Sequence, residues 1–445
     1  MNYFYLFLIY TTNIIVSTTN IYGGGCAIQK DSLYYLGGKR YDLSDDTVND
    51  FNKDIFKLDL NYITVKDKFR VLTPKENGLE RMFTNILPSN LHDNEIMVYG
   101  GRNILTNDSF VTYDIKSNKI NLNIRASQWP GTTLNPDTSI YNKDPVYSDQ
   151  LSTWVRSDID PDLTVLYGGY LNDTDFKMVH FGGGKVVKYS ERSEDWTYQT
   201  GRESTGLNLF DHASTIHDGN MYVLGGKGYD HNFLSFDRLL KFDLRNSSWD
   251  VITLKGDVPS DSIGHDIKYF DNKLILSGGA LDSQLKTLRK VIFSLDLDSN
   301  SWTKHEIPGL DTVGYHPCVQ MLNNSVMLAS FGMRDSSAKE LQLIDLKQMK
   351  VIDYYSALGD KASNTSSILI WVFIPSLLLI LFFGILFLFL LRKRGYIFKK
   401  KTNREIKSDL PNDDESLNYT LNEFTPPDWY EDMGQPVKNR TYDLK

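Results

Sequence analysis

The chain repeats one pattern of apolar and polar positions six times. In five copies a short run of strand-forming residues ends in two glycines and then turns polar, as in "MYVLGGKGYD" (Met221–Asp230), and the sixth copy ends in Phe-Gly instead. A spacing of roughly 50 to 70 residues between copies indicates a repeat architecture, in which each unit is one supersecondary motif. The first glycine of each pair, or the residue aligned with it, is Gly37, Gly100, Gly168, Gly225, Gly278 and Phe331.

A second apolar run follows each glycine pair, and its alternation predicts a strand half buried in a sheet. Another short strand precedes the glycines, for example His212–His217, so each repeat contains about four strands. The six second runs are Phe56–Leu60, Val111–Ile115, Val186–Ser190, Leu240–Leu244, Phe293–Leu297 and Gln342–Leu346. Six residues beyond the Asp position of each run stands a large apolar residue, which we interpret as packing between sheets: Val65, Ile120, Trp196, Trp249, Trp302 and Val351.

These motifs resemble the kelch repeats of β-propellers over about residues 24–355. Repeats four and five fit best, whereas repeat three has Ser190 at the usual Asp position and repeat six has Phe331 at the first glycine. The resemblance implies an all-β, six-bladed propeller with the first strand of each blade innermost. Six sheets placed radially bury both faces of each sheet against their neighbours.

Apolar segments near both ends predict a single-pass membrane protein with its propeller outside. Residues 1–20 are interpreted as a signal peptide, and a signal anchor is the alternative, opposed by the short, interrupted apolar run. Ile368–Leu391 holds 24 residues without a charge, enough for a helix of roughly 36 Å that spans a bilayer. Residues 356–367 form a stalk. Six basic residues in Arg392–Lys401 place the tail, 392–445, in the cytoplasm.

Composition adds constraints on partners and modification. The formal net charge of −8 and the absence of a basic stripe outside the juxtamembrane run argue against nucleic-acid binding. The polar tail is expected to be disordered, with a Y-x-x-bulky sorting motif at Tyr430 and Met433 that a cytoplasmic adaptor recognises. N-glycosylation is predicted at five lumenal sequons: Asn107, Asn172, Asn246, Asn323 and Asn364.

The two cysteines of the chain align with the first strands of the first and last repeats. Cys26 lies eleven residues before Gly37, as Ser214 lies eleven before Gly225. The "HPC" that contains Cys318 aligns with "HAS" (His212–Ser214) if two residues are inserted before Val326, so both cysteines are predicted at the same position of the first strand. First and last blades are neighbours in a closed ring, and kelch-like propellers bring their innermost strands close together. We therefore predict a Cys26–Cys318 disulfide that closes the ring in an oxidising compartment. The alternative is two separate buried thiols.

The chain offers residues for two kinds of metal site. The kelch-like fold includes galactose oxidase, whose copper site needs two Tyr, two His and a Tyr–Cys cross-link, and these ligands do not map onto this chain. His212, His265 and His316 align near the channel and are metal candidates, although each is also explained by local hydrogen bonding at a strand start. Neither a catalytic residue nor a cofactor is therefore assigned.

The long connections predict where a partner binds. The connections between strands two and three and those between blades open on one face of a propeller, and the longest insertion is about Arg125–Thr153. Its Trp129, Tyr141 and Tyr147 suit interface anchors, and a structureless decoration is the alternative. The expected function is recognition of a protein or glycan outside the cell or in the secretory pathway, as an adhesion, receptor or scaffold protein. Alternatives are an extracellular oxidase and a secretory-pathway scaffold or sorting protein.

Overall fold

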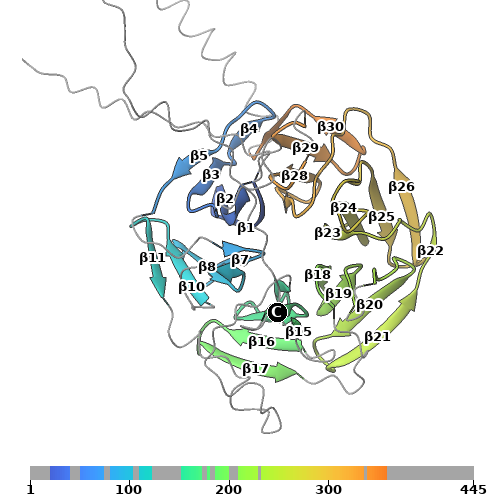
Figure 1. Ribbon diagram of the computed structural model, residues 1–445, viewed down its shortest axis with the longest axis horizontal. Coiled ribbons are helices and arrows are strands. Elements are labelled where there is room, and N and C mark those ends of the chain that lie inside the picture. Colours follow the sequence, from blue (N-terminus) through green and yellow to red (C-terminus); the bar gives the residue numbers. More distant parts are fainter. Residues whose placement is uncertain are drawn as a thin grey trace, which may run out of the picture. The chain divides into compact units, whose positions relative to one another are not determined.

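The protein folds as a ring of six four-stranded antiparallel sheets (Figure 1). In this computed structural model the described residues are 21–40, 51–74, 81–103, 110–122, 152–172, 178–180, 186–199, 209–228, 232–334 and 338–357. All of them fall in the first of two contact units, Met1–Ile368, and none in the second, Leu369–Lys445. The predicted all-β, six-bladed propeller is therefore confirmed.

Each blade takes its four main strands from consecutive chain, so no main sheet shares a strand between the two ends. The blades contain, in order, β1 (Ile21–Gln29), β2 (Ser32–Arg40), β3 (Ile55–Asp59) and β5 (Arg70–Leu72); β7 (Asn85–Pro88), β8 (Glu95–Tyr99), β10 (Phe110–Asp114) and β11 (Lys119–Leu122); β12 (Thr153–Arg156), β13 (Leu163–Tyr167), β16 (Val186–Ser190) and β17 (Asp195–Gln199); β18 (Ala213–His217), β19 (Asn220–Leu224), β20 (Arg238–Asp243) and β21 (Ser248–Thr253); β23 (Ile263–Phe270), β24 (Lys273–Ala280), β25 (Ile292–Asp296) and β26 (Ser301–His305); and β27 (Cys318–Met321), β28 (Val326–Ser330), β29 (Leu341–Asp345) and β30 (Lys350–Ile352).

Short extra strands decorate the ring. In the connections, β6 (Arg81–Met82) pairs with β9 (Arg102–Asn103), and β14 (Tyr170–Asn172) pairs with β15 (Met178–His180). β22 (Lys255–Gly256) adds a parallel fifth strand to the edge of blade five. β31 (Tyr354–Ser356) pairs with β4 (Tyr62–Thr64), which joins the end of the described chain to blade one.

The predicted packing position between sheets holds in four blades. Ile120, Trp196, Trp249 and Trp302 lie in the outermost strands and are at most 8% exposed. Val351 also lies in its outer strand, opposite Ile344, but is only half buried. Val65 packs half buried against the core shared by blades one and six, but it does not lie in the outer strand of blade one, because β4 is inserted before that strand. The register of β3 and β5, continued by one residue beyond the Lys57–Arg70 pair, instead places Phe69 at the corresponding position, and Phe69 is 3% exposed.

The first glycine of a repeat makes room for a histidine of the next blade. Gly168 and Gly225 have positive φ values of 68° and 61°, which favour glycine. The rings of His212 and His265 occupy the space that a β-carbon on these two glycines would need. The repeated glycine is therefore a blade-to-blade packing feature as well as a turn residue.

Side chains of the innermost strands alternate between two directions. Ile86 of blade two packs on Gly25 of blade one, and Trp154 of blade three packs on Tyr99 and Phe110 of blade two. Each of the two residues pairs with the residue that lies two positions before the first glycine of its own blade. Side chains at this register position therefore point back to the preceding blade. Their sequence neighbours therefore point toward the central channel and the following blade.

The predicted disulfide joins Cys26 and Cys318, with their Cα atoms 5.7 Å apart. The prediction that both occupy the same register position is wrong. Cys26 pairs with Tyr35, two residues before Gly37, whereas Cys318 pairs with Ser330, one residue before Phe331. Because side chains alternate along a strand, this offset of one residue directs the Cys26 side chain back toward blade six and the Cys318 side chain forward toward blade one. The two sulfur atoms can therefore meet between the blades.

Several predicted segments lie outside the described residues. They include the signal peptide (1–20), the bilayer-spanning segment (Ile368–Leu391) and the tail (392–445), together with nearly all of the stalk. Among the described residues, no helix has the length and apolar character needed to cross a bilayer.

Candidate functional site

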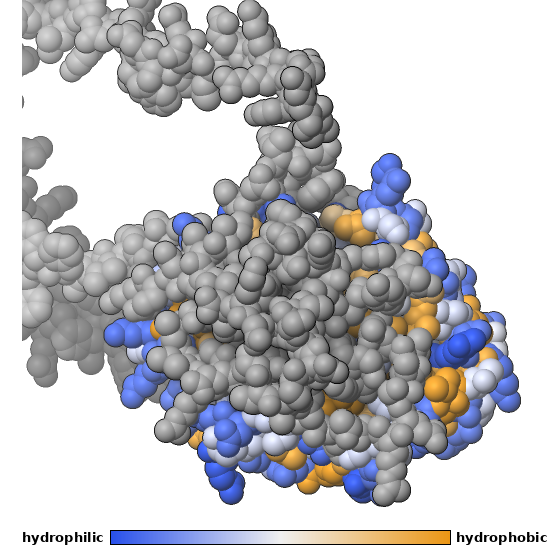
Figure 2. All heavy atoms as spheres, turned by 60° about the horizontal axis from the view of Figure 1, so that its bottom comes forward, coloured by the Kyte–Doolittle hydropathy of each residue, from blue (hydrophilic) through white to orange (hydrophobic). Residues whose placement is uncertain are grey.

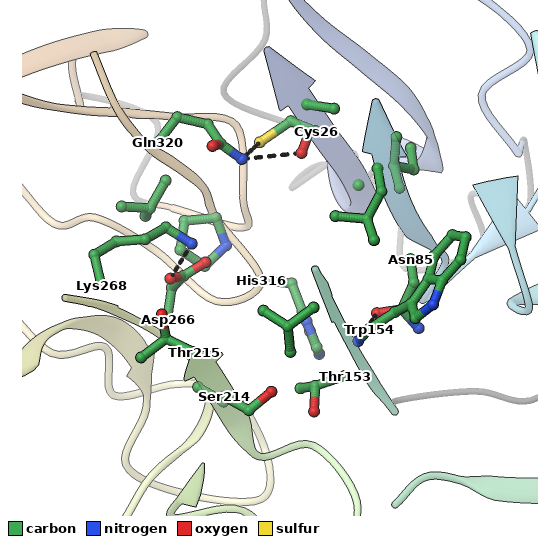
Figure 3. Close-up of a pocket in the computed structure, with 18 of the residues that line it drawn as sticks. Cys26, Asn85, Thr153, Trp154, Ser214, Thr215, Asp266, Lys268, His316 and Gln320 are labelled. Atoms are coloured by element: carbon green, nitrogen blue, oxygen red, sulfur yellow. Dashed lines mark hydrogen bonds and ion pairs between the residues drawn. The ribbon is translucent and has the colours of Figure 1, made fainter. Parts of the chain in front are cut away.

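A cavity of about 620 Å³ occupies the centre of the ring. Residues from the innermost strand of every blade line it, from β1, β7, β12, β18, β23 and β27. Figure 3 shows Gln320, Lys268, Asp266 and Thr215 on one side of this space, with Asn85 and Trp154 on the other. The channel is therefore a lined cavity rather than a filled core.

One mouth of the cavity carries a collar of residues in the left-handed backbone conformation. In each blade, one residue of the first strand pairs with the first glycine of the second strand, and the collar residue is the one just before it in sequence. The collar is therefore a feature of the repeat. The described collar residues are Gly23 (φ 71°), Phe83 (62°), Asp211 (59°), Gly264 (58°) and His316 (48°).

Side chains of the collar meet across its two glycines. His316 Nε2 lies 2.8 Å from Asp211 Oδ1, which joins blade six to blade four over Gly264 of blade five. On the other side, the His316 ring lies 4.9 Å from the Phe83 ring of blade two, over Gly23 of blade one. The absence of a β-carbon at both glycines leaves the space for these contacts.

The carboxylate of Asp211 is held ionised in a buried position. Burial alone would raise its pKa, but the adjacent imidazole of His316 and, to a lesser extent, the ammonium group of Lys227 outweigh burial and lower it. The Tyr315 hydroxyl also donates to Asp211 Oδ2 at 3.3 Å. The collar is therefore a charged, hydrogen-bonded rim that bridges alternate blades.

The three candidate histidines are not brought into one site. His212 Nε2 lies 2.9 Å from Thr153 Oγ1, and His265 Nε2 donates to the Leu224 carbonyl at 3.0 Å, so both bond to the preceding blade. Burial lowers the pKa of His212 to about 3 and that of His265 to about 4. His316 is one register position earlier and belongs to the collar. Within the described ranges, no three His, Cys, Asp or Glu residues form a metal-binding group.

Three buried arginines anchor the connections on the loop face, which we define as the face with the connections between second and third strands and between blades. Arg289 donates to Ser260 O at 2.6 Å and so ties a loop of blade five to the connection before it. Arg334 donates to Lys339 O at 2.8 Å within the blade-six loop, and Arg81 donates to Gly100 O at 3.2 Å. All three side chains are at most 4% exposed.

The remaining predicted site residues are only partly described. Asn246 and Asn323 are exposed in turns on the opposite face, which we call the turn face. The backbone of Asn172 lies in β14. The others lie outside the described residues: Asn107, Trp129, Tyr141, Tyr147, Asn364, Tyr430 and Met433.

The collar and the buried arginines were missed in the sequence. Arginine is usually exposed, and only the folded ring shows that these three guanidinium groups bond to loop carbonyls. The collar had one visible signal, because Asp211 and Gly264 directly precede aligned histidines and both residue types favour left-handed turns.

Both cysteines of the chain are used in the disulfide, which leaves no thiol for a galactose-oxidase-like Tyr–Cys cross-link. Residues 157–372 match a family model described as the KLHDC2/KLHL20/DRC7 Kelch-repeats domain. The match covers most of blade three and all of blades four to six, and so includes repeats four and five, whose motifs fit best. Together, this match and the six observed blades support a kelch-type β-propeller fold.

Proposed function

We propose that this protein is a membrane-anchored, non-catalytic scaffold whose propeller binds a protein partner through its loop face. The main support is the order of that face, where buried Arg81, Arg289 and Arg334 donate hydrogen bonds to backbone carbonyls of the irregular connections. Connections fixed in this way present side chains at low entropic cost, as binding loops on rigid scaffolds do.

The described surface itself offers no large apolar area that would bind a partner. Figure 2 shows apolar residues interspersed with polar ones on the coloured part of one face. The exposed large apolar side chains of the described residues are Tyr62, Leu91, Ile159, Val251, Val258 and Tyr354. Tyr62 and Tyr354 stack on each other where β4 pairs with β31, and the other four lie in different blades and turns. This scattering favours the long insertion, with Trp129, Tyr141 and Tyr147, as the principal binding segment.

Replacement of residues 125–150 by a short Gly–Ser link tests the binding segment. We expect the variant to keep its fold and its passage through the cell, and to lose the partners captured from the outward side by proximity labelling. A matched control shortens residues 173–177, between β14 and β15. Partner capture that is unchanged after removal of residues 125–150 would contradict the proposal.

The membrane anchor is proposed from Ile368–Leu391 and the basic run after it, with the N-terminus outside and the C-terminus cytoplasmic. Protease treatment of sealed vesicles should leave the propeller protected and should remove an epitope at the C-terminus. A protein that floats with membranes only when residues 368–391 are present would agree. Protection of the C-terminal epitope instead would show that the orientation is wrong.

A further inference from the structure

An ion pair in the cavity wall has no role in joining blades. Lys268 Nζ lies 2.7 Å from Asp266 Oδ1, and both residues belong to the innermost strand β23 of blade five. Both side chains are 24% exposed and line the cavity. Both charged groups are therefore partly removed from water, which costs hydration free energy. The pair does not offset this cost by joining two sheets, because both residues belong to one strand.

Other charged groups around the cavity do join blades. Arg156 of blade three donates to the Pro88 carbonyl of blade two and pairs with Glu191, which accepts from the backbone of Asn90 in blade two. Asp211 and His316 join blades four and six. Among the described residues that line the cavity, the Asp266–Lys268 ion pair thus differs from the others, because it does not connect one blade to another.

The cavity wall at the level of Lys268 is divided into a polar half and an apolar half. Lys268 pairs with Ile275, three residues before the first glycine of its blade. At the same register position, blades four and six carry Thr215 and Gln320, whereas blades two and three carry Leu87 and Val155. A ligand in this cavity therefore meets charges and hydrogen-bonding groups on one side and aliphatic groups on the other.

We propose that the central cavity binds a small zwitterion of the α-amino acid class with an aliphatic side chain. Lys268 would bind the carboxylate, Asp266 the ammonium group, and Leu87 and Val155 the aliphatic part. In an α-amino acid the ammonium and carboxylate groups are attached to the same carbon atom, so both can reach Asp266 and Lys268, whose charged atoms are only 2.7 Å apart. The amino and carboxyl termini of a peptide are too far apart to do so. This site is distinct from the proposed protein-binding loops.

Hydrogen bonding at the site agrees with this orientation. The ammonium group of Lys268 has three donors, of which Asp266 Oδ1 uses one, so donors remain for a carboxylate. Gln320 Nε2 donates to the Cys26 carbonyl at 3.0 Å, which leaves the amide oxygen of Gln320 as an acceptor for an ammonium group. The cavity of about 620 Å³ has room for such a ligand together with water.

Calorimetric titration of the full-length protein with L-leucine tests the proposal. Lys268→Met and Asp266→Asn each remove one charge with little change of volume, and each should weaken leucine binding at least about tenfold. Lys304→Met is the matched control, because Lys304 pairs with exposed Glu306 away from the cavity. The control variant should bind leucine like the unaltered protein.

Two truncated probes separate the two charge contacts in the unaltered protein. 3-Methylbutylamine lacks the carboxylate and 4-methylpentanoate lacks the ammonium group, and both should bind at least about tenfold more weakly than leucine. Should a cavity variant fail to fold, these probes still test the proposal. Absence of leucine binding, equal binding of either truncated probe, or full binding by Lys268→Met would overturn it. None of these outcomes bears on the loop-face partner, which the loop replacement tests.

Discussion

The seam between blades six and one and the interface between blades four and five fill the same space in opposite ways. At the interior interface, His265 of the following blade packs on Gly225 of the preceding blade. At the seam, the corresponding residues are Gly24 and Phe331, so the large side chain comes from the preceding blade instead. The Phe331 ring stacks on Tyr35 of blade one at 3.7 Å.

This exchange shows that the apparently degraded sixth repeat is complementary to the first. Phe331 is fully buried and also contacts the rings of Phe56 and Phe69 in blade one. A glycine there would leave a void, since blade one has no histidine to fill it. Departure from a repeat motif is therefore a packing solution where two non-consecutive blades meet.

The seam also carries links that the interior interface does not need. Blades four and five are joined by continuous chain, whereas blades six and one are joined by the disulfide, by the β31–β4 pairing and by the Lys68–Glu340 ion pair at 2.6 Å. Covalent and strand-pairing links therefore replace chain continuity where the ring closes.

The largest expected effect comes from removal of the disulfide. The bond connects residues 292 apart in sequence, and loop-closure entropy predicts a loss of about 5 kcal/mol in the free energy of unfolding when it is reduced. Urea unfolding with and without a reducing agent measures this loss. The Cys26→Ser/Cys318→Ser protein is the control and should not respond to the reductant; equal unfolding midpoints for oxidised and reduced protein would contradict the prediction.

Restoration of the motif glycine at position 331 should destabilise the protein. Phe331→Gly removes a fully buried aromatic ring, which costs about 3–5 kcal/mol in the free energy of unfolding. Relief of the positive φ of 52° returns only about 1 kcal/mol. Phe331→Leu keeps an apolar side chain but loses the ring stack on Tyr35, so its free energy of unfolding should lie between those of the original protein and Phe331→Gly. A Phe331→Gly protein as stable as the original would show that the position is simply a degraded glycine.

The interior histidines should make stability depend on pH. The unfolded chain takes up protons below the ordinary histidine pKa of about 6.5, whereas folded His212 and His265 stay neutral until about pH 3 and about pH 4. Stability should therefore fall as pH falls from about 6.5 to about 4, by about 1.4 kcal/mol per pH unit for each histidine. Unfolding curves measured across this range give the slope.

His265→Gln sharpens this test, because glutamine can still donate to the Leu224 carbonyl but does not titrate. The slope between pH 6 and pH 4.5 should fall by about half. Burial raises the pKa of Asp266, whose titration changes stability in the opposite direction but equally in both proteins. Identical slopes in the two proteins would show that His265 does not control this dependence.

The smallest expected effect is at the surface of the seam. Lys68 is 45% exposed and its partner Glu340 is 20% exposed, so solvent screens much of their attraction. Lys68→Met should lower the free energy of unfolding by less than about 1 kcal/mol, and added salt should shrink the difference. If Lys68→Met lowered the free energy of unfolding as much as reduction of the disulfide does, the ion pair would not be the weaker of the two seam contacts, and the prediction would be wrong.

The sequence determined the repeat, the number of blades and the pairing of the two cysteines. Short-range apolar alternation and recurrent glycines depend on local backbone geometry, which each repeat carries in its own residues. The disulfide partners also followed from repeat order, because the first and last units of a closed ring are neighbours. Val65 was misplaced because a local insertion, β4, shifted the outer strand of blade one.

Only the tertiary structure decided which side chains meet across the ring. The Phe331 stack, the collar contact between Asp211 and His316, and the β31–β4 pairing each join residues from different repeats. A one-residue change of register reverses the direction of a strand side chain, as the two cysteines show, and spacing alone does not fix that register across a seam. The polar and apolar halves of the cavity likewise arise only when six separate strands are brought around one axis.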